Sequence, residues 1–261
     1  MKKISAILLV LTLLASCFCF TSCGSKGKTL DQVKKAGKLV MATSPDFPPF
    51  EYLGENSKVE GIEVELLTMV CEKLGVTLEI EQMDFDSVLL GVQTGKYDVG
   101  VSGISVTPAR EKNTLFTTPY CLAAQAIVVK EDSTIQGKAD LTGKKISVQS
   151  GTTAEEYCLA QKYDVLSYAD NNDAASALTS GRVDAWVIDD LTAAEMVTKL
   201  EGVKILDEAM TTEPYAFAMA FGSETLRDEI DRIIKEFLAD GTVKALFEKY
   251  GAPYTDPSSA K

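Results

Sequence analysis

Residues 121–129 have the sequence CLAAQAIVV, and a second apolar stretch, residues 215–221, has the sequence YAFAMAF. Each is short and apolar enough to form a buried strand, and each joins one block of alternating strands and helices to another. If both cross between two lobes, the first lobe is built from both ends of the chain and the second lobe from its middle. The alternative is that both are ordinary core strands, and periodicity alone does not separate these two interpretations.

Strand patterns alternate with helix patterns on both sides of these stretches, which is typical of an α/β fold. Several apolar helical patterns end at a glycine, which commonly stops a helix. The expected strands are residues 39–43, 76–83, 97–101, 145–149, 165–168 and 185–188. The expected helices are residues 30–36, 62–73, 86–94, 152–161, 172–179 and 191–199, followed by an amphipathic pair over 223–250 that is broken at Gly241.

The N-terminus has the pattern of a secretory signal peptide, because a short positive region precedes an almost uninterrupted apolar run over residues 4–20. Two cysteines follow small residues and resemble the lipidated cysteine of a bacterial lipobox, Cys17 and Cys23. We predict cleavage before Cys23, because residues 24–28, GSKGK, then supply a polar flexible tether. Cys17 is the second choice. An uncleaved membrane anchor is disfavoured, because the apolar run is short for that role.

Composition excludes several classes of function. The formal net charge is −12 at pH 7, and a nucleic-acid partner is not expected because phosphate contacts need a basic face. The sequence contains no histidine, which removes histidine triads, Cys-His dyads and nearly all zinc sites, so we expect neither a metal nor another cofactor. The thiols beyond the N-terminus, Cys71, Cys121 and Cys158, are best interpreted as small buried side chains, although one disulfide among them stays open.

A series of short motifs runs through most of the chain. They are SPDFPPFE at 44–51, GIEVEL at 61–66, GKYD at 95–98, SGISVTPARE at 102–111, QSGTT at 149–153, GRVDA at 181–185 and EPY at 213–215. Each motif is weak alone, but together they are specific in order and spacing. Over residues 38–250 the chain resembles the bacterial extracellular solute-binding proteins of family 3, the polar amino-acid-binding proteins of ABC importers.

This resemblance implies a two-lobed, periplasmic-binding-protein-like fold of type II, in which each lobe has a central sheet flanked by helices and two crossovers form the hinge. It assigns residues 38–120 and 212–255 to the first lobe and 121–211 to the second, after a signal peptide (1–22) and a lipidated tether with the first helix (23–37). The implied protein is a monomer, anchored by lipid to the outer face of the cell membrane. By hinge closure it captures an amino acid and delivers it to a membrane permease.

The resemblance also implies a site for the two charges of an amino acid. Arg110 matches the arginine that grips the carboxylate, and its planar fork suits a bidentate contact. Asp189 matches the acid that pairs with the ammonium group. A helix start after a strand also offers backbone amides to an anion. The hydroxyl and amide groups expected to complete the pocket belong to Ser102, Gly103, Ser105, Thr152 and Thr153.

Phe47 and Phe85 match the aromatic positions that flank the ligand side chain, where two facing rings bury a flat or aliphatic group. Close family members for basic amino acids and for glutamine carry an acid at the position of Ser44. Asp46 lies two residues further and points to the same side of an extended segment, so it is a candidate replacement. Gln149 is a second candidate for recognising the side chain. We therefore expect a polar or cationic amino acid.

Each of these residues also has a purely structural interpretation. Arg110 fits a surface arginine at a helix start, and Asp189 fits a cap for the helix that opens at Leu191. The two phenylalanines fit core aromatics, and Thr152 fits a helix N-cap. Taken together within the family pattern, the binding interpretation is favoured.

Two other functions are alternatives that rank after that of an importer subunit. Some relatives of this fold are cyclohexadienyl or arogenate dehydratases that use an acid in the cleft, and fold alone does not settle function. The acids available here for such a role are Asp46 and Glu51, with no histidine to assist them. The other alternative is a sensory ligand-binding subunit that feeds a receptor instead of a permease.

Overall fold

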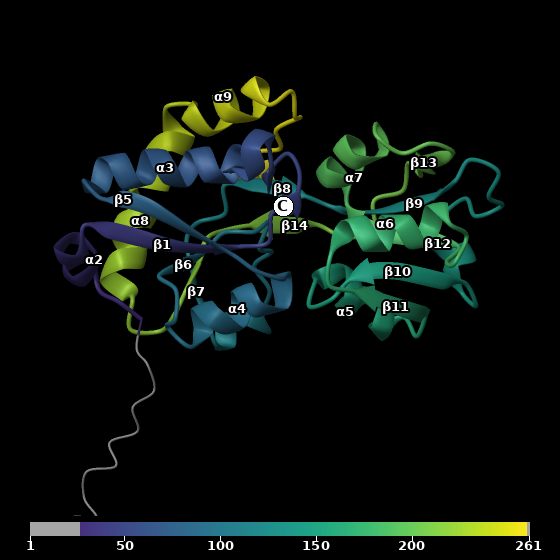
Figure 1. Ribbon diagram of the computed structural model, residues 1–261, viewed down its shortest axis with the longest axis horizontal. Coiled ribbons are helices and arrows are strands. Elements are labelled where there is room, and N and C mark those ends of the chain that lie inside the picture. Colours follow the sequence, from purple (N-terminus) through teal and green to yellow (C-terminus); the bar gives the residue numbers. More distant parts are fainter. Residues whose placement is uncertain (1–26, 260–261) are drawn as a thin grey trace, which may run out of the picture.

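Two α/β lobes lie side by side in the computed structural model, which describes residues 27–259 (Figure 1). Each lobe contains a five-stranded sheet flanked by helices. This architecture confirms the fold class predicted from the sequence. The predicted signal peptide and the candidate lipidation sites Cys17 and Cys23 lie outside the described residues.

The sheet of the first lobe combines both ends of the chain. β1 pairs in parallel with β5 and β6, whereas β15 runs antiparallel to β6 and β7. Its strand order is β5 (Thr77–Gln82), β1 (Lys38–Thr43), β6 (Val99–Gly100), β15 (Ala218–Met219) and β7 (Leu115–Phe116). Its helices are α2 (Leu30–Ala36), α3 (Ile62–Leu74), α4 (Phe85–Gln93), α8 (Glu224–Ala239) and α9 (Thr242–Lys249). A small separate sheet consists of β2 (Asp46–Phe47), β3 (Glu51–Leu53) and β4 (Val59–Glu60).

The sheet of the second lobe comes from the middle of the chain. β10 pairs in parallel with β11 and β12, and β9 runs antiparallel to β12 and β13. Its strand order is β11 (Asp164–Tyr168), β10 (Lys145–Gln149), β12 (Ala185–Asp189), β9 (Gln125–Lys130) and β13 (Val203–Ile205). Its helices are α5 (Thr153–Ala160), α6 (Asn171–Thr179) and α7 (Asp190–Val197). Short 3-10 turns in the two lobes and the tail cover Glu55–Ser57, Arg110–Lys112, Lys138–Leu141 and Pro257–Ser259.

The two apolar stretches that suggested a crossing do cross between the sheets. Each is split into two strands, β8 (Cys121–Ala123) with β9, and β14 (Glu213–Tyr215) with β15. β8 and β14 form an antiparallel pair of their own, which lies between the lobes in Figure 1. In each stretch the chain first pairs within the hinge and then continues into a lobe sheet, through β9 in the second lobe and through β15 in the first.

Most helix ends follow their local sequence. Thr29 forms a capping box with Gln32 at the start of α2, and Gly37 and Gly75 end α2 and α3 in the left-handed conformation that glycine adopts without strain. The predicted strand 97–101 is shorter than expected, since only Val99–Gly100 forms a ladder. The amides next to this ladder still donate to carbonyl groups of β1.

One continuous hydrophobic cluster includes buried side chains from both lobes, among them Leu66 on α3 and Trp186 on β12. Cys71, Cys121 and Cys158 are free and buried, which confirms their interpretation as small core side chains. Within residues 27–259, every helix is too short or too polar to cross a membrane.

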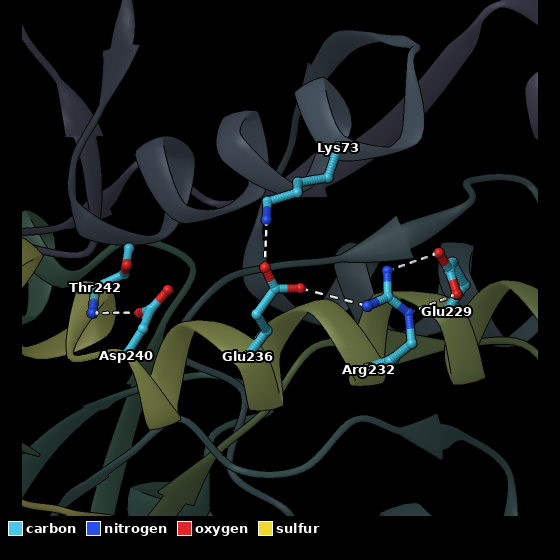
Figure 2. A network of polar contacts seen from close by, with 6 residues as sticks. All are labelled: Lys73, Glu229, Arg232, Glu236, Asp240 and Thr242. Atoms are coloured by element: carbon cyan, nitrogen blue, oxygen red, sulfur yellow. Dashed lines mark hydrogen bonds and ion pairs between the residues drawn. The ribbon is translucent and has the colours of Figure 1, made fainter.

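Charged side chains bridge α3 and α8 on the surface of the first lobe (Figure 2). Glu236 accepts from Lys73 and, at 3.3 Å, from Arg232, whose guanidinium also contacts Glu229 at 3.0 Å. These side chains are about half exposed, so the network contributes little to stability beyond orienting the two helices.

Substituting Leu66 tests whether the shared core makes the lobes unfold together. Leu66 is fully buried, and Leu66→Ala should lower the free energy of unfolding by about 2–5 kcal/mol through the cavity it leaves. Trp186, the single tryptophan of the sequence, reports on the second lobe. In urea titrations of Leu66→Ala, the Trp186 fluorescence and the far-UV circular dichroism should shift together. A fluorescence midpoint that stays at the wild-type value would show that the lobes unfold independently.

Candidate functional site

The structure brings all eleven predicted ligand-binding residues together around one cavity between the lobes. The cavity measures about 20 Å³, which leaves room for about one water molecule. The lobes are therefore close together here. The lining residues are Asp46, Phe47, Phe85, Ser102, Gly103, Ser105, Arg110, Gln149, Thr152, Thr153 and Asp189.

Arg110 lies at the floor of this cavity and is not a surface arginine, because only 6% of it is exposed. Its Nη1 donates to the carbonyl oxygen of Ser105 at 3.0 Å, and its Nη2 donates to the carbonyl oxygen of Gly151 in the other lobe at 3.0 Å. The guanidinium lies 5.7 Å from the centre of the Phe85 ring. Burial lowers the pKa of Arg110, and acids from both lobes oppose that effect. The guanidinium is thus a buried cation held by two carbonyl groups, with no carboxylate of residues 27–259 bonded directly to it.

Asp189 ends β12 and faces the cavity from the second lobe. It occupies the N-cap position of α7, but its side chain makes no capping hydrogen bond. Its carboxylate accepts instead from Nε2 of Gln125 at 2.8 Å and from the hydroxyl of Tyr215. Burial, followed by the nearby Glu213, raises the pKa of Asp189 to about 7. The predicted cation and anion thus enter the same cavity from opposite lobes.

Thr152 and Thr153 line the cavity at the start of α5. The hydroxyl of Thr152 accepts from the amide of Glu155 at 3.2 Å and donates to the carbonyl of Gln149 at 2.7 Å, so this side chain is a helix N-cap. The hydroxyl of Thr153 accepts from Gln125 at 3.2 Å. The predicted capping role of Thr152 and its place in the cavity wall are therefore compatible.

The two phenylalanines occupy different surroundings. Phe85 lies beneath the guanidinium of Arg110, whereas Phe47 stacks on Phe50 with ring centres 5.8 Å apart. Gly103 has φ +53°, and a Cβ there would lie 2.5 Å from the Phe47 ring. Only glycine combines this backbone angle with such a close approach. Each ring therefore packs against protein and also forms part of the cavity wall.

Asp46 lines the cavity, and its carboxylate already has three donors. Oδ1 accepts from the hydroxyl of Ser44 at 2.9 Å, whereas Oδ2 accepts from Nε2 of Gln149 at 3.0 Å and from the amide of Asn171 at 2.7 Å. The last two donors belong to the second lobe. Burial raises the pKa of Asp46, an effect that the nearby Asp170 increases. The two predicted side-chain readers, Asp46 and Gln149, are thus bonded to each other across the cleft.

Further contacts hold the two walls together. The hydroxyl of Ser150 donates to Oδ2 of Asp86 at 2.8 Å, in addition to the bonds made by Asp46 and Arg110. In each of these contacts, one partner comes from the first lobe and the other from the second. The conformation described here is therefore a closed one.

Three residues of the site were missed from the sequence. The backbone amide of Asn171 donates to Asp46, and its side-chain Nδ2 donates to Gln149. The only feature of the sequence that indicated a role for Asn171 was its position as a polar residue after a strand. Gln125 is the single polar side chain in the apolar stretch 121–129, a pattern that marks a buried polar role. Tyr215 belongs to the EPY motif, but its hydroxyl contact with Asp189 depends on pairing between distant strands.

The geometry suits capture of a small zwitterion. A buried guanidinium and a buried carboxylate stand on opposite walls, so an anionic and a cationic group of one molecule would each find a partner. Asp46 adds a second acid with no buried cation bonded to it among the described residues. The cavity consequently carries an excess of negative charge.

Comparison with known proteins places the chain in a family. Residues 39–253 match the family described as bacterial extracellular solute-binding proteins, family 3. The chain belongs to this family, as its motifs predicted.

Individual relatives agree with this assignment. The chain is 33% identical over 232 residues to the L-cystine-binding protein TcyJ of Escherichia coli (strain K12), with 87% of each chain covered. It is 34% identical over 250 residues to the arginine-binding extracellular protein ArtP of Bacillus subtilis (strain 168), which covers 92% of this chain and 96% of ArtP. The crystal structure of the ancestral amino acid-binding protein AncCDT-1, a precursor of cyclohexadienyl dehydratase, superposes with a TM-score of 0.80 at 33% identity, covering 85% of this chain and 99% of that one.

Removing the Asp46 carboxylate should open the ligand-free protein. Hydrogen bonds to charged groups contribute about 1.5–3 kcal/mol each, and Asp46→Ala deletes two that cross between the lobes. We expect the balance between closed and open forms to shift by at least about tenfold, with a larger radius of gyration in small-angle X-ray scattering. The exposed Asp84, whose side chain does not cap α4, gives the matched control Asp84→Ala. Identical scattering from Asp46→Ala and the wild type would contradict the role of Asp46 in closure.

Proposed function

We propose that this chain is the extracytoplasmic substrate-binding lipoprotein of an ABC importer, which captures a polar or cationic amino acid by hinge closure and delivers it to a membrane permease. The observation that carries this proposal is the placement of Arg110 and Asp189 in one buried cavity, on opposite lobes. Arg110 would bind the α-carboxylate, and Asp189 would bind the α-ammonium group. Because each lobe supplies one partner, the full set of contacts forms only when the lobes close.

A cationic side chain is favoured by the balance of charge in the cavity. The two charges of the amino-acid backbone would pair with Arg110 and Asp189, which would leave the carboxylate of Asp46 in excess in the same cavity. A guanidinium or a second ammonium group would offset that charge. The arginine named for ArtP carries a guanidinium beyond the α-carbon, which supports this choice. The cystine named for TcyJ carries a second ammonium group together with a second carboxylate, so its distal end adds no net charge.

The contacts of the first described residues bear on which lobe a lipid anchor would tether. The amide of Gly27 donates to the carbonyl of Phe221 at 3.1 Å, and Lys28 pairs with the buried Asp98 at 2.8 Å. The chain is therefore joined to the first lobe from its first described residues. A lipid on Cys23 would tether this lobe and leave the second lobe free to close over the ligand.

A cleft dehydratase is the alternative that the similarity to AncCDT-1 keeps open. The two acids considered for that chemistry are poorly placed for it. Asp46 already accepts three hydrogen bonds, and Glu51 is buried behind Ser102 and does not line the cavity. Turnover of prephenate or arogenate by the purified protein would replace the binding proposal with an enzymatic one.

A thermal-shift screen of the twenty amino acids tests the proposed function. A ligand at a hundred times its Kd stabilises the folded state by about 2.7 kcal/mol, and we expect arginine and other cationic amino acids to give the largest shifts. Arg110→Ala should abolish these shifts, with affinity lower by at least about a hundredfold, while the exposed Arg182→Ala should bind as the wild type does. No stabilisation by any amino acid, or full affinity in Arg110→Ala, would refute the assignment.

Ligand affinity should also depend on pH through Asp189. Its pKa of about 7 in the ligand-free protein means that the carboxyl group is largely protonated below neutrality, whereas an ammonium ligand needs the ionised form. Affinity should therefore rise with pH, by about a hundredfold from pH 5 to pH 8, as measured by calorimetry. Asp189→Asn should bind weakly with a flat profile, and the exposed Asp173→Asn should keep the wild-type slope. A slope that persists in Asp189→Asn would point to Asp46 instead.

A further inference from the structure

Two glutamates lie directly behind the wall of the binding cavity. Glu51 begins β3 and Glu63 lies in the first turn of α3, and both are fully buried. Neither lines the cavity, and neither has a part in the binding proposal. Two buried acids in this position therefore need a separate physical explanation.

Each glutamate holds one residue of the cavity wall. Oε2 of Glu63 accepts from the amide of Gly103 at 2.9 Å, and its Oε1 accepts from the hydroxyl of Tyr120. Oε1 of Glu51 accepts from the hydroxyl of Ser102 at 3.1 Å. The remaining oxygen, Oε2 of Glu51, is buried and has no hydrogen-bond partner among residues 27–259.

No cation neutralises this pair. Among residues 27–259, no lysine or arginine forms an ion pair with Glu51 or Glu63. The titratable groups that face Glu51 are Glu63 from α3 and Asp46 from β2, with the Tyr120 hydroxyl on Glu63. Two adjacent buried carboxyl groups without a cation cannot both be ionised, so at least one of them keeps a proton.

The contacts indicate which glutamate carries the proton. Both oxygens of Glu63 already accept a hydrogen bond, Oε2 from the amide of Gly103 and Oε1 from the hydroxyl of Tyr120. Glu51 has one oxygen without a donor, where a proton can reside. Burial, followed by the charge of Glu63, raises the pKa of Glu51 well above its ordinary value.

We propose that Glu51 and Glu63 share one proton, carried by Glu51 and directed at Glu63, and that this pair positions Ser102 and Gly103 for the ligand head group. The proton gives Oε2 of Glu51 the partner that it lacks and removes the repulsion between the two carboxylates. Both glutamates are positioning residues. Their effect on ligand affinity rests on the proposed function, whereas the shared proton does not.

Protonation of Glu51 is measured without any ligand. In NMR spectra of protein labelled with ¹³C at the glutamate side-chain carboxyl, one signal should keep the position of a protonated acid at pH 7, and Glu51→Gln should lack it. If every glutamate carboxyl of the wild type titrates near the ordinary pKa of about 4.3, the proposal is overturned. Because this spectrum is recorded on the wild type, the result stands even if Glu51→Gln fails to fold.

Stability against pH gives a second readout. Above pH 4.3 the unfolded chain loses the Glu51 proton that the folded chain keeps, so the wild type should lose stability relative to Glu51→Gln as pH rises. The ratio of their unfolding constants should change by about tenfold per pH unit up to the raised pKa. The exposed Glu201→Gln provides the matched control and should track the wild type. A constant difference between Glu51→Gln and the wild type would contradict the shared proton.

Measurements of ligand affinity distinguish the role of Glu51 from that of Glu63. Glu51→Gln imitates the protonated acid, so its affinity for the amino acid that stabilises the wild type should stay within about threefold. Glu63→Gln turns an amide NH2 toward one of its two donors, so affinity should fall at least about tenfold. Equal losses in both variants would contradict the assigned positions of the charge and the proton. If the wild type binds no amino acid, the proposed function fails while the protonation measurements remain decisive.

Discussion

The antiparallel pairing of β8 with β14 is the constraint on which the rest of the molecule depends. This pair connects the two sheets and brings two buried tyrosines to the lobe boundary. Tyr120, next to β8, donates to Glu63 of the first lobe, and Tyr215, at the end of β14, donates to Asp189 of the second lobe. A hydroxyl at the hinge thus satisfies one buried acid in each lobe. The two tyrosines and the two acids therefore connect the hinge, where the lobes would move, with the residues in and behind the cavity wall.

Buried charge explains why the cavity is suited to binding. A buried carboxylate or guanidinium is costly unless it is paired and hydrogen-bonded. In the described part of the chain, Arg110 and Asp189 have neutral hydrogen-bond partners but no directly bonded opposite charge. A zwitterion placed between them would complete both pairs at once. The protein leaves these two charges incompletely compensated, and this makes a ligand with both signs of charge favourable.

Asp46 belongs both to the cavity wall and to the contact between the lobes. Its carboxylate lines the cavity and also accepts the amide at the start of α6 in the opposite lobe. The same acid can therefore stabilise the closed form and offset a cationic ligand group. This double use accounts for an acid at position 46 in a segment where Ser44 is neutral, because the Ser44 hydroxyl serves as one of its donors.

The sequence by itself determined the alternation of strands and helices, most of their ends and the membership of the cavity wall. These features depend on local patterns, such as the capping residue Thr29, the left-handed glycines and the ordered motifs of the family. Only the tertiary structure decided which side chains are partners. The bonds from Asn171 to Asp46, from Tyr215 to Asp189 and from Ser102 to Glu51 join residues that are far apart in the chain. No local pattern encodes such pairs, because they arise from strand pairing and lobe contact. The same reason explains why two glutamates that look ordinary in sequence become an acid pair without a cation once they are buried together.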